Sequence, residues 1–283
     1  MPVTRPAPIT RKQVAAFLKP RPRDSHKGLF GTVTVIGGST GLVGAALLAG
    51  RAALKMGAGC VHVGMLADNA PAVDVIQPEL MLHSAGDALK STKPNVLVVG
   101  CGLGKSLPAQ KMLYDALLLD VALVLDADAL NIIAMRPDLR GMLHTRRAPT
   151  VFTPHPGEAA HLLTCSTEEV QKDRAAAVRE LARRLGGSVV LKGAGSLCVT
   201  SDGKLHINHT GNPGMSSAGM GDVLSGMIAA FIAQGLSADE ALLLGVHLHG
   251  AAGDELAHQH ATLGMSATEV TEWARWLLNR WMP

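Results

Sequence analysis

The stretch NHTGNPGMSSAGMGDVLSGMIAAF, residues 208–231, joins a glycine-rich loop to the start of a long helix. Turn-forming residues dominate its first half, and small apolar residues from Val223 onward predict the helix. A loop of this kind leaves backbone N–H groups free at the helix N-terminus, where the helix dipole is positive. Glycines at 219 and 221 keep side chains from holding an anion away from those amides. The stretch therefore predicts an anion-binding site at the beginning of a helix.

Asp222 is the unexpected residue in this loop, because a carboxylate among the amides would compete with a bound phosphate. One interpretation makes Asp222 the N-terminal capping residue of the helix. The other makes it a base within reach of a substrate hydroxyl, while the amides hold a phosphoryl group. The second interpretation describes a phosphoryl-transfer site that has no Walker lysine.

Composition narrows the class of protein. The chain has 283 residues, of which 47% are hydrophobic, and no apolar run approaches the ~18 residues of a membrane span. The four cysteines lie far apart without a CxxC pair, which argues against a disulfide framework or a cysteine metal site and fits a reducing cytosol. Aromatic residues make up 3% of the chain and the net charge is only +3. We therefore expect a cytoplasmic protein that contacts neither membranes nor nucleic acid.

Strand and helix patterns alternate along the chain. Buried strands are predicted at 32–36, 61–65, 95–99, 122–125, 150–152 and 189–191, and a short strand at 80–82. A hairpin is predicted at 197–208, and helices at 10–18, 44–56, 107–118, 167–185, 218–234, 238–260 and 267–281. Such alternation favours an α/β fold with a mostly parallel central sheet and helices on both faces. No linker divides the chain, so we expect one domain over residues 1–283, with residues 1–27 as an N-terminal helix and extension.

Polar or glycine-rich motifs follow one predicted strand after another. They are GGSTG (37–41), GCGLG (100–104), DAD (126–128), TPHPGE (153–158), KGAG (192–195) and AGMGD (218–222). Ligands of open parallel sheets bind at the carboxyl ends of the strands. The regular placement of these motifs therefore indicates an enzyme that handles a nucleotide or a phosphate.

Several of these motifs have two interpretations. The prolines of TPHPGE fix the backbone around His155, which either contacts a ligand or caps the helix that follows. Glu158 either touches a hydrated Mg²⁺ or favours the helix N-terminus. Lys192, beside Gly193 and Gly195, suits a nucleotide phosphate or ribose, although a plain hairpin turn would look similar.

The remaining polar motifs are less specific. On an extended backbone only one of Asp126 and Asp128 would point inward, either to bind metal or substrate or to hydrogen-bond Asn131. The loop GCGLGKS, residues 100–106, lacks the spacing of a P-loop, although its glycine amides could line a ligand. Four histidines at 247, 249, 258 and 260 have no three members at ligand spacing on one helix face, which argues against a metal site.

With these motifs in this order, the chain resembles the ADP/ATP-dependent NAD(P)H-hydrate dehydratase family of the ribokinase-like superfamily. The resemblance runs from about Gly28 to the end of the chain and implies a ribokinase-like three-layer α/β/α fold. It also implies an activity, the repair of NADH or NADPH that has added water at C6 of the nicotinamide ring (NADHX and NADPHX). In this reaction the C6 hydroxyl of the S epimer is phosphorylated at the expense of ADP or ATP, and phosphate then leaves.

The resemblance also implies roles for individual residues. Asp222 would take the proton of the C6 hydroxyl, and the amides of Gly219, Met220 and Gly221 would hold the transferring phosphoryl group. The hydrate would contact Ala45, Gly104, His155 and Asp222. The nucleotide would contact Lys192, Gly193, Ala194, Gly195, Ser196 and Gly221. Mg²⁺ would bridge the phosphates, with Glu158 near it through water.

Further expectations concern assembly and alternatives. The resemblance implies a homotetramer. About 28 residues precede the match, too few for the epimerase domain that many members carry, so an NAD(P)HX epimerase is the expected functional partner. Ser216-Ser217-Ala218-Gly219 stands where the family more often reads Ala-Thr-Gly-Gly, a change that could shift nucleotide preference. The alternative function is a small-molecule kinase of the same superfamily, acting on a vitamin precursor or sugar alcohol with the same Asp222 and anion hole.

Overall fold

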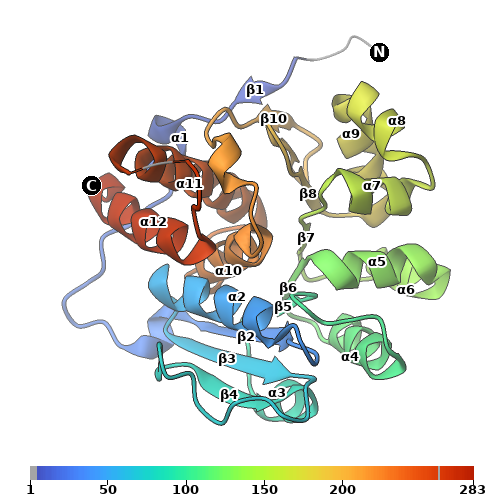
Figure 1. Ribbon diagram of the computed structural model, residues 1–283, viewed down its shortest axis with the longest axis vertical. Coiled ribbons are helices and arrows are strands. Elements are labelled where there is room, and N and C mark those ends of the chain that lie inside the picture. The colour runs from blue at the N-terminus through green and yellow to red at the C-terminus, as the bar shows by residue number, and fades with distance from the viewer. Residues whose placement is uncertain (1–4, 261) are drawn as a thin grey trace.

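A ten-stranded, mostly parallel sheet forms the centre of the molecule (Figure 1). The computed structural model describes residues 5–260 and 262–283. The strands of the sheet are β1 (Ala7–Pro8), β2 (Thr32–Gly37), β3 (Cys60–Met65), β4 (Met81–Ser84), β5 (Val96–Val99), β6 (Ala122–Leu125), β7 (Thr150–Phe152), β8 (Ser188–Leu191), β9 (Leu197–Val199) and β10 (Leu205–Ile207). Their order across the sheet is β1-β10-β9-β8-β7-β6-β5-β2-β3-β4, and β9 runs antiparallel to both of its neighbours.

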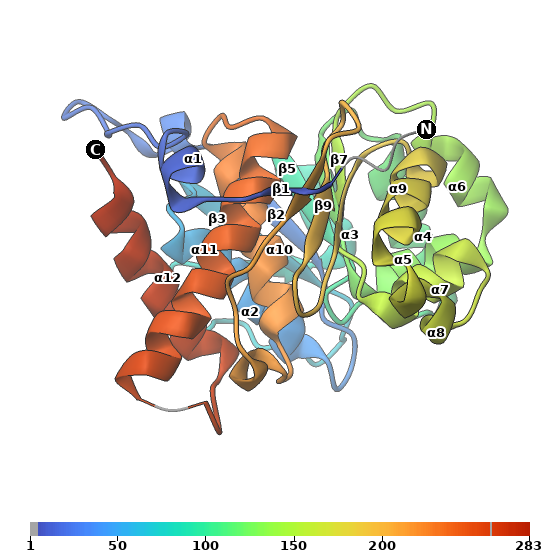
Figure 2. The same cartoon turned by 90° about the horizontal axis from the view of Figure 1, so that it is seen from above.

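Helices cover both faces of this sheet, as two views at right angles show (Figures 1 and 2). One layer holds α1 (Arg11–Ala15), α2 (Val43–Lys55), α10 (Met220–Ala233), α11 (Ala238–Gln259) and α12 (Ala267–Trp281). The other holds α3 (Ala85–Ser91), α4 (Leu107–Leu118), α5 (Ala127–Met135), α6 (Pro137–Leu143), α7 (Pro156–Leu163), α8 (Thr167–Lys172) and α9 (Arg174–Leu185). Two short 3₁₀ turns, η1 (Lys27–Phe30) and η2 (Pro213–Met215), lie in loops. In the described part of the chain, none of the helices is long and apolar enough to cross a membrane.

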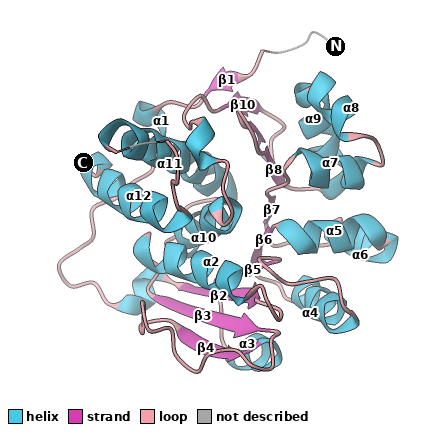
Figure 3. Ribbon diagram, in the orientation of Figure 1, coloured by secondary structure: helices cyan, strands magenta, loops and turns pink. Residues whose placement is uncertain are grey.

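Each central strand contributes to two separate hydrophobic cores. Val96 and Val98 of β5 belong to the core under α2 and α10, whereas Leu97 and Val99 belong to the core on the other face. Successive side chains of a strand point to opposite faces, so a strand covered on both sides is apolar throughout. This is why the buried strands appear in the sequence as uninterrupted apolar runs, and the predicted parallel sheet with helices on both faces is confirmed (Figure 3).

The structure corrects three details of the predicted elements. The helix predicted over 167–185 is two helices, because Asp173 leaves helical geometry and its side chain caps α9 by accepting a hydrogen bond from the N–H of Ala176. The strand predicted at 80–82 is β4, at Met81–Ser84. The segment after β6 was not predicted to be helical, yet α5 begins directly at Ala127.

Helix α10 packs closely against α2. A Cβ atom at Gly226 would lie 2.1 Å from the carbonyl oxygen of Ala49, far inside van der Waals contact. Only glycine therefore permits this crossing. The crossing matters for function because α10 carries Asp222 at its first turn.

Replacing Gly226 with alanine should force α10 and α2 apart. We expect Gly226→Ala to lower the free energy of unfolding by about 2–3 kcal/mol, because overpacking a close contact displaces backbone on both sides. Urea denaturation measures this effect. Gly141→Ala is the matched control, since a Cβ at that helical glycine meets no atom within 4 Å. Equal unfolding free energies for the two variants would contradict the close-packing argument.

Candidate active site

Residues that follow β5, β6 and β8 meet the first turn of α10 at the carboxyl ends of these strands. The N-terminal cap of α10 is Gly219, whose φ of 89° is left-handed. Helical geometry begins at Met220, so Asp222 is the third residue of the helix and makes no capping hydrogen bond. The capping interpretation of Asp222 is therefore wrong. The first N–H groups of the helix have no intrahelical partner, which leaves them directed toward the site.

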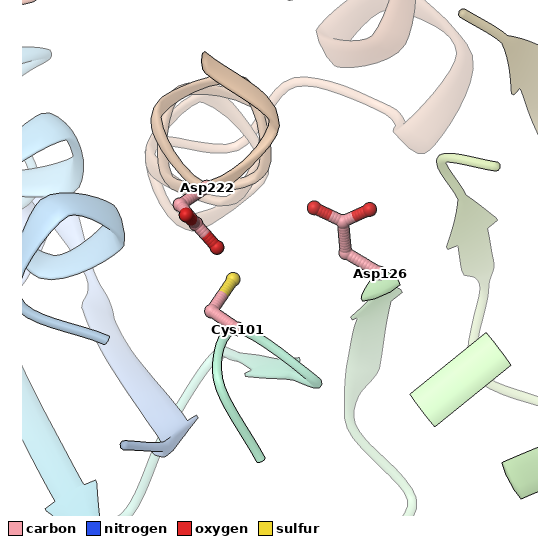
Figure 4. Close-up of side chains that lie close together, drawn as sticks. All are labelled: Cys101, Asp126 and Asp222. Carbon is pink, nitrogen blue, oxygen red and sulfur yellow. The ribbon is translucent and has the colours of Figure 1, made fainter. Parts of the chain in front are cut away.

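Three side chains converge beneath this helix (Figure 4). Cys101 follows β5, Asp126 directly follows β6, and Asp222 lies in the first turn of α10. The thiol sulfur and one oxygen of each carboxylate lie within 4.8 Å of one another. Cys101 and Asp126 are almost completely buried, with exposed fractions of 0% and 1%.

Asp126 is held by two hydrogen bonds from opposite sides. The ammonium of Lys192 donates to its Oδ1 at 2.9 Å, and the hydroxyl of Ser225 donates to its Oδ2 at 2.9 Å. Burial works to raise the pKa of Asp126, but the charge and hydrogen bond of Lys192 hold it below the ordinary value. Asp126 is therefore an ionised carboxylate that is fully engaged within the protein.

Asp126 and Asp128 do not share an extended backbone, as the sequence interpretation assumed. Helix α5 begins between them at Ala127, whose φ is 48°. Asp128 accepts a hydrogen bond from the N–H of Gly104 at 2.8 Å. Asn131, the expected structural partner of the two aspartates, is instead bonded to the carbonyl of Ala127 and the ring of His161.

Two other carboxyls of the site are difficult to ionise. Burial, followed by the charge of Asp126, raises the pKa of Asp222 to about 7. Burial also raises the pKa of Glu158 to about 7, although the charge of Lys192 opposes the rise. Burial alone would lower the pKa of Lys192, but Asp126 and Glu158 raise it. One lysine thus faces three carboxyls, and the site has an excess of potential negative charge.

His155 caps helix α7, which confirms one of its two interpretations. Its Nδ1 accepts hydrogen bonds from the N–H groups of Gly157 at 3.0 Å and Glu158 at 3.3 Å. Glu158 returns the contact by accepting from the N–H of His155 at 2.8 Å, which completes a capping box. Its Oε2 also lies 4.0 Å from Lys192 Nζ, so this helix start borders the charged cluster.

A pocket of about 590 Å³ opens beside the cluster. The turn after β8 forms one wall, the 208–216 loop another, and the start of α10 the floor. The six residues predicted to contact the nucleotide all line it: Lys192, Gly193, Ala194, Gly195, Ser196 and Gly221. The four residues predicted to contact the hydrate lie outside the lining of this pocket: Ala45 on α2, Gly104 and His155 on the loops after β5 and β7, and Asp222 in the first turn of α10.

Lys192 lies directly against the start of α10. A Cβ atom at Gly221 would lie 3.0 Å from Lys192 Nζ and 3.4 Å from Asp126 Oδ2. Glycine at this position keeps the helix amides and the lysine ammonium adjacent. The arrangement suits a doubly charged anion, which amides would contact from one side and a cation from the other.

Sequence analysis did not assign three polar residues of the site: Cys101, Ser225 and His249. Ser225 lies one turn beyond Asp222 and is fully buried against Asp126. His249 of α11 lines the pocket, burial lowers its pKa to about 4, and its Nε2 has no hydrogen-bond partner among the described residues. A serine in an apolar helix gives no signal of its partner 99 residues away.

The donor groups of the site fit Mg²⁺ better than a softer metal. Carboxylate oxygens and phosphates are the ligands that Mg²⁺ prefers, usually with several retained waters. Glu158 provides such an oxygen next to the excess negative charge. The Cys101 thiol is poorly suited to a metal, because burial and then the charges of Asp222 and Asp126 raise its pKa well above the ordinary value.

Comparisons with known proteins agree with this geometry. The sequence model of the NAD(P)H-hydrate dehydratase family matches residues 33–275. The chain belongs to the NAD(P)H-hydrate dehydratase family. It is 43% identical over 266 residues to an ADP-dependent (S)-NAD(P)H-hydrate dehydratase of Neisseria meningitidis serogroup B, covering 93% of this chain and 90% of the relative.

Two further likenesses place this dehydratase among its relatives. It is 43% identical to a bifunctional NAD(P)H-hydrate repair enzyme of Escherichia coli K12, covering 93% of this chain but only half of that enzyme. It superimposes on the ADP/ATP-dependent NAD(P)H-hydrate dehydratase of Bacillus subtilis, co-crystallised with ATP and Mg²⁺, with a TM-score of 0.87 and 31% identity. That match covers 97% of this chain and 98% of the other, and it confirms the ribokinase-like fold.

The raised pKa of Asp222 should appear as a pH-dependent difference in stability. The folded protein holds this proton more tightly than the unfolded chain, so the stabilisation is present at low pH and is lost as pH rises through about 7. We expect Asp222→Asn, which stays neutral, to melt about 2–5 °C above the wild type near pH 8.5 and above it by less than half of that margin near pH 5, where the carboxyl of the unfolded chain is still mostly ionised.

Differential scanning calorimetry at the two pH values measures this difference. Asp24→Asn, at an exposed carboxylate, is the control and should follow the wild type at both. A melting temperature of Asp222→Asn that tracks the wild type at both pH values would contradict the burial argument.

Proposed function

We propose that this dehydratase restores NADH and NADPH from the S epimers of their C6 hydrates, with ADP as the phosphoryl donor. The observation that carries the proposal is the position of Asp222 in the first turn of α10, directly after Met220 and Gly221, which line the pocket together with the KGAG turn. The name of the meningococcal relative supports the S epimer and ADP. The B. subtilis enzyme is described as dependent on ADP or ATP, so both donors are to be tested.

The nucleotide occupies the pocket in this proposal. Its phosphates lie over the N-terminus of α10, where the amides of Gly219, Met220 and Gly221 hold the transferring group. The fixed ammonium of Lys192 contacts the phosphates from below. Mg²⁺, held near Glu158 through water, supplies further neutralisation of phosphate charge when it is bound.

Asp222 acts on the hydroxyl of the hydrate. The C6 hydroxyl oxygen forms a bond to the terminal phosphorus, the bond from phosphorus to the nucleotide breaks, and the hydroxyl proton passes to Asp222. A pKa of about 7 suits this role, because an effective base has a pKa near the operating pH.

Elimination completes the reaction. The phosphate ester is a better leaving group than hydroxide, and the lone pair of the ring nitrogen expels it from C6. Loss of a proton from the neighbouring ring carbon then restores the dihydronicotinamide ring. Ala45, Gly104 and His155, which lie outside the nucleotide pocket, orient the hydrate in this proposal.

The activity test uses acid-hydrated NADH with Mg²⁺ and either ADP or ATP. We expect the near-ultraviolet absorbance of reduced nicotinamide to recover in a nucleotide-dependent manner. Asp222→Asn should lower kcat by about 10²–10⁴-fold, because the general base is lost. Wild-type kcat/KM for the hydrate should rise with pH through about 7, as Asp222 loses its proton.

Each other outcome of this test has a definite meaning. Failure to recover absorbance with either nucleotide would contradict the dehydratase proposal. Alcohols that a small-molecule kinase would phosphorylate would then be the substrates to test. Recovery that survives Asp222→Asn would keep the function and remove Asp222 from its mechanism. Asp24→Asn again serves as the matched carboxylate control.

We also infer that the protein works as a homotetramer beside an NAD(P)HX epimerase. The exposed apolar side chains of Val75 (86%), Ile76 (61%) and Trp276 (41%) support subunit contacts. With a mixture of the two epimers, we expect recovery to stop when the S epimer is spent and to resume when an epimerase is added. Complete recovery without epimerase would contradict the epimer preference. A molar mass by light scattering equal to that of one 29.4 kDa chain would contradict the tetramer.

A further inference from the structure

The thiol of Cys101 lies at the centre of the site without a role in the reaction described above. Its exposed fraction is 0%, and it points toward Asp222 (Figure 4). The chain around it is tightly constrained. Its carbonyl oxygen accepts a hydrogen bond from the N–H of Gly38 at 3.0 Å, and a Cβ at Gly100 would lie 1.8 Å from the carbonyl oxygen of Asp126. The sulfur therefore has a fixed position.

The neighbouring carboxylates compete unequally for the single thiol hydrogen. Both oxygens of Asp126 already accept hydrogen bonds, from Lys192 and Ser225. The Cys101 sulfur lies within 4.8 Å of a carboxylate oxygen of Asp222, and among the residues that the structure describes no other side chain donates a hydrogen bond to Asp222. The thiol hydrogen is thus available to Asp222.

We propose that Cys101 is a positioning residue for the dehydration reaction, whose buried thiol donates a hydrogen bond that orients the carboxylate of Asp222 toward the substrate hydroxyl. This inference rests on the proposed role of Asp222 as the base. Cys101 itself does not touch the substrate in this arrangement, because its side chain is covered by α10 and the strand ends.

The charges around Asp222 explain why such a donor is needed. Burial and the charge of Asp126 raise the pKa of Asp222, and Asp128 adds to the rise. The Cys101 thiol and the charge of Lys192 lower it. Because Asp126 and Asp128 both oppose ionisation, the thiol and Lys192 are the side chains that favour the charged, reactive form.

The thiol can fill this role throughout the working range of pH. Burial, with the charges of Asp222 and Asp126, raises the pKa of the Cys101 thiol well above its ordinary value. The group therefore stays protonated and acts as a donor rather than as a nucleophile. A thiol is a weak donor, which steadies the carboxylate without removing its basicity.

Three variants test the proposal. Cys101→Ala removes the donor, and we expect kcat near pH 7 to fall about tenfold, with the KM of the nucleotide unchanged. The acidic limb of kcat/KM should move upward by about one pH unit, because loss of the hydrogen bond makes Asp222 harder to ionise. Cys101→Ser, whose hydroxyl also donates, should restore both values to within about threefold of wild type.

Cys198→Ala is the matched control. Cys198 has an exposed fraction of 0% on β9, so this substitution removes an equally buried thiol from the sheet. We expect it to change the melting temperature as much as Cys101→Ala does and to leave the pH profile unchanged. An acidic limb that stays in place in Cys101→Ala, or that moves equally in Cys198→Ala, would overturn the proposal.

A spectroscopic measurement separates this proposal from the proposed function. The S–H stretching band of Cys101, identified by its loss in Cys101→Ser, should shift toward the position of a free thiol in Asp222→Leu. An unshifted band would mean that the two groups are not hydrogen-bonded, whatever the activity. A shifted band together with an active Asp222→Asn would confirm the hydrogen bond and place the failure in the role of Asp222 as base.

Discussion

The ion pair between Lys192 and Asp126 is the constraint on which the other charges of the site depend. It joins the ends of two strands that are neighbours of β7, and Ser225 ties the same carboxylate to α10. Breaking one partner of a buried pair leaves an uncompensated charge, so each group holds the other in place. With Lys192 committed to Asp126, Glu158 and Asp222 face a cation that is only partly available to them. A bound nucleotide and its metal enter a site whose charges are already arranged around this pair.

The basicity proposed for Asp222 follows from opposing local effects. Burial and like charge make the carboxyl reluctant to ionise, whereas the Cys101 thiol and Lys192 favour ionisation. A carboxylate fully exposed to water would be too weak a base, and one without any stabilising partner would stay protonated at neutral pH. The site therefore relies on balance rather than on one strong interaction. The thiol that contributes to this balance belongs to the loop after β5. The glycines of that loop allow three backbone segments to pack in direct contact.

The sequence allowed some of this site to be predicted, and the limits have physical causes. The position of the KGAG turn at the pocket could be predicted from the sequence, because consecutive residues at a strand end must lie close together. The order of strands and motifs also identified the edge of the sheet where the site lies. The hydrogen bond between Ser225 and Asp126 could not be predicted, because Ser225 lies 99 residues away in an apolar helix. His155 had two interpretations until the structure showed its Nδ1 bonded to helix amides. The break at Asp173 was missed because helical charge periodicity continues across it.

The close crossing of α2 and α10 at Gly226 has a consequence for the spacing between the two bound ligands. Helix α2 carries Ala45, and α10 carries Asp222 and the amides of the anion site. Because the backbones touch at Gly226 and Ala49, the two helices have little room to shift relative to each other. In the proposed mechanism, the fold then sets the distance between the nicotinamide ring and the phosphoryl group. Adaptation to a different phosphoryl donor or hydrate would have to come from the loops at the rim of the site, where residues change without altering that distance.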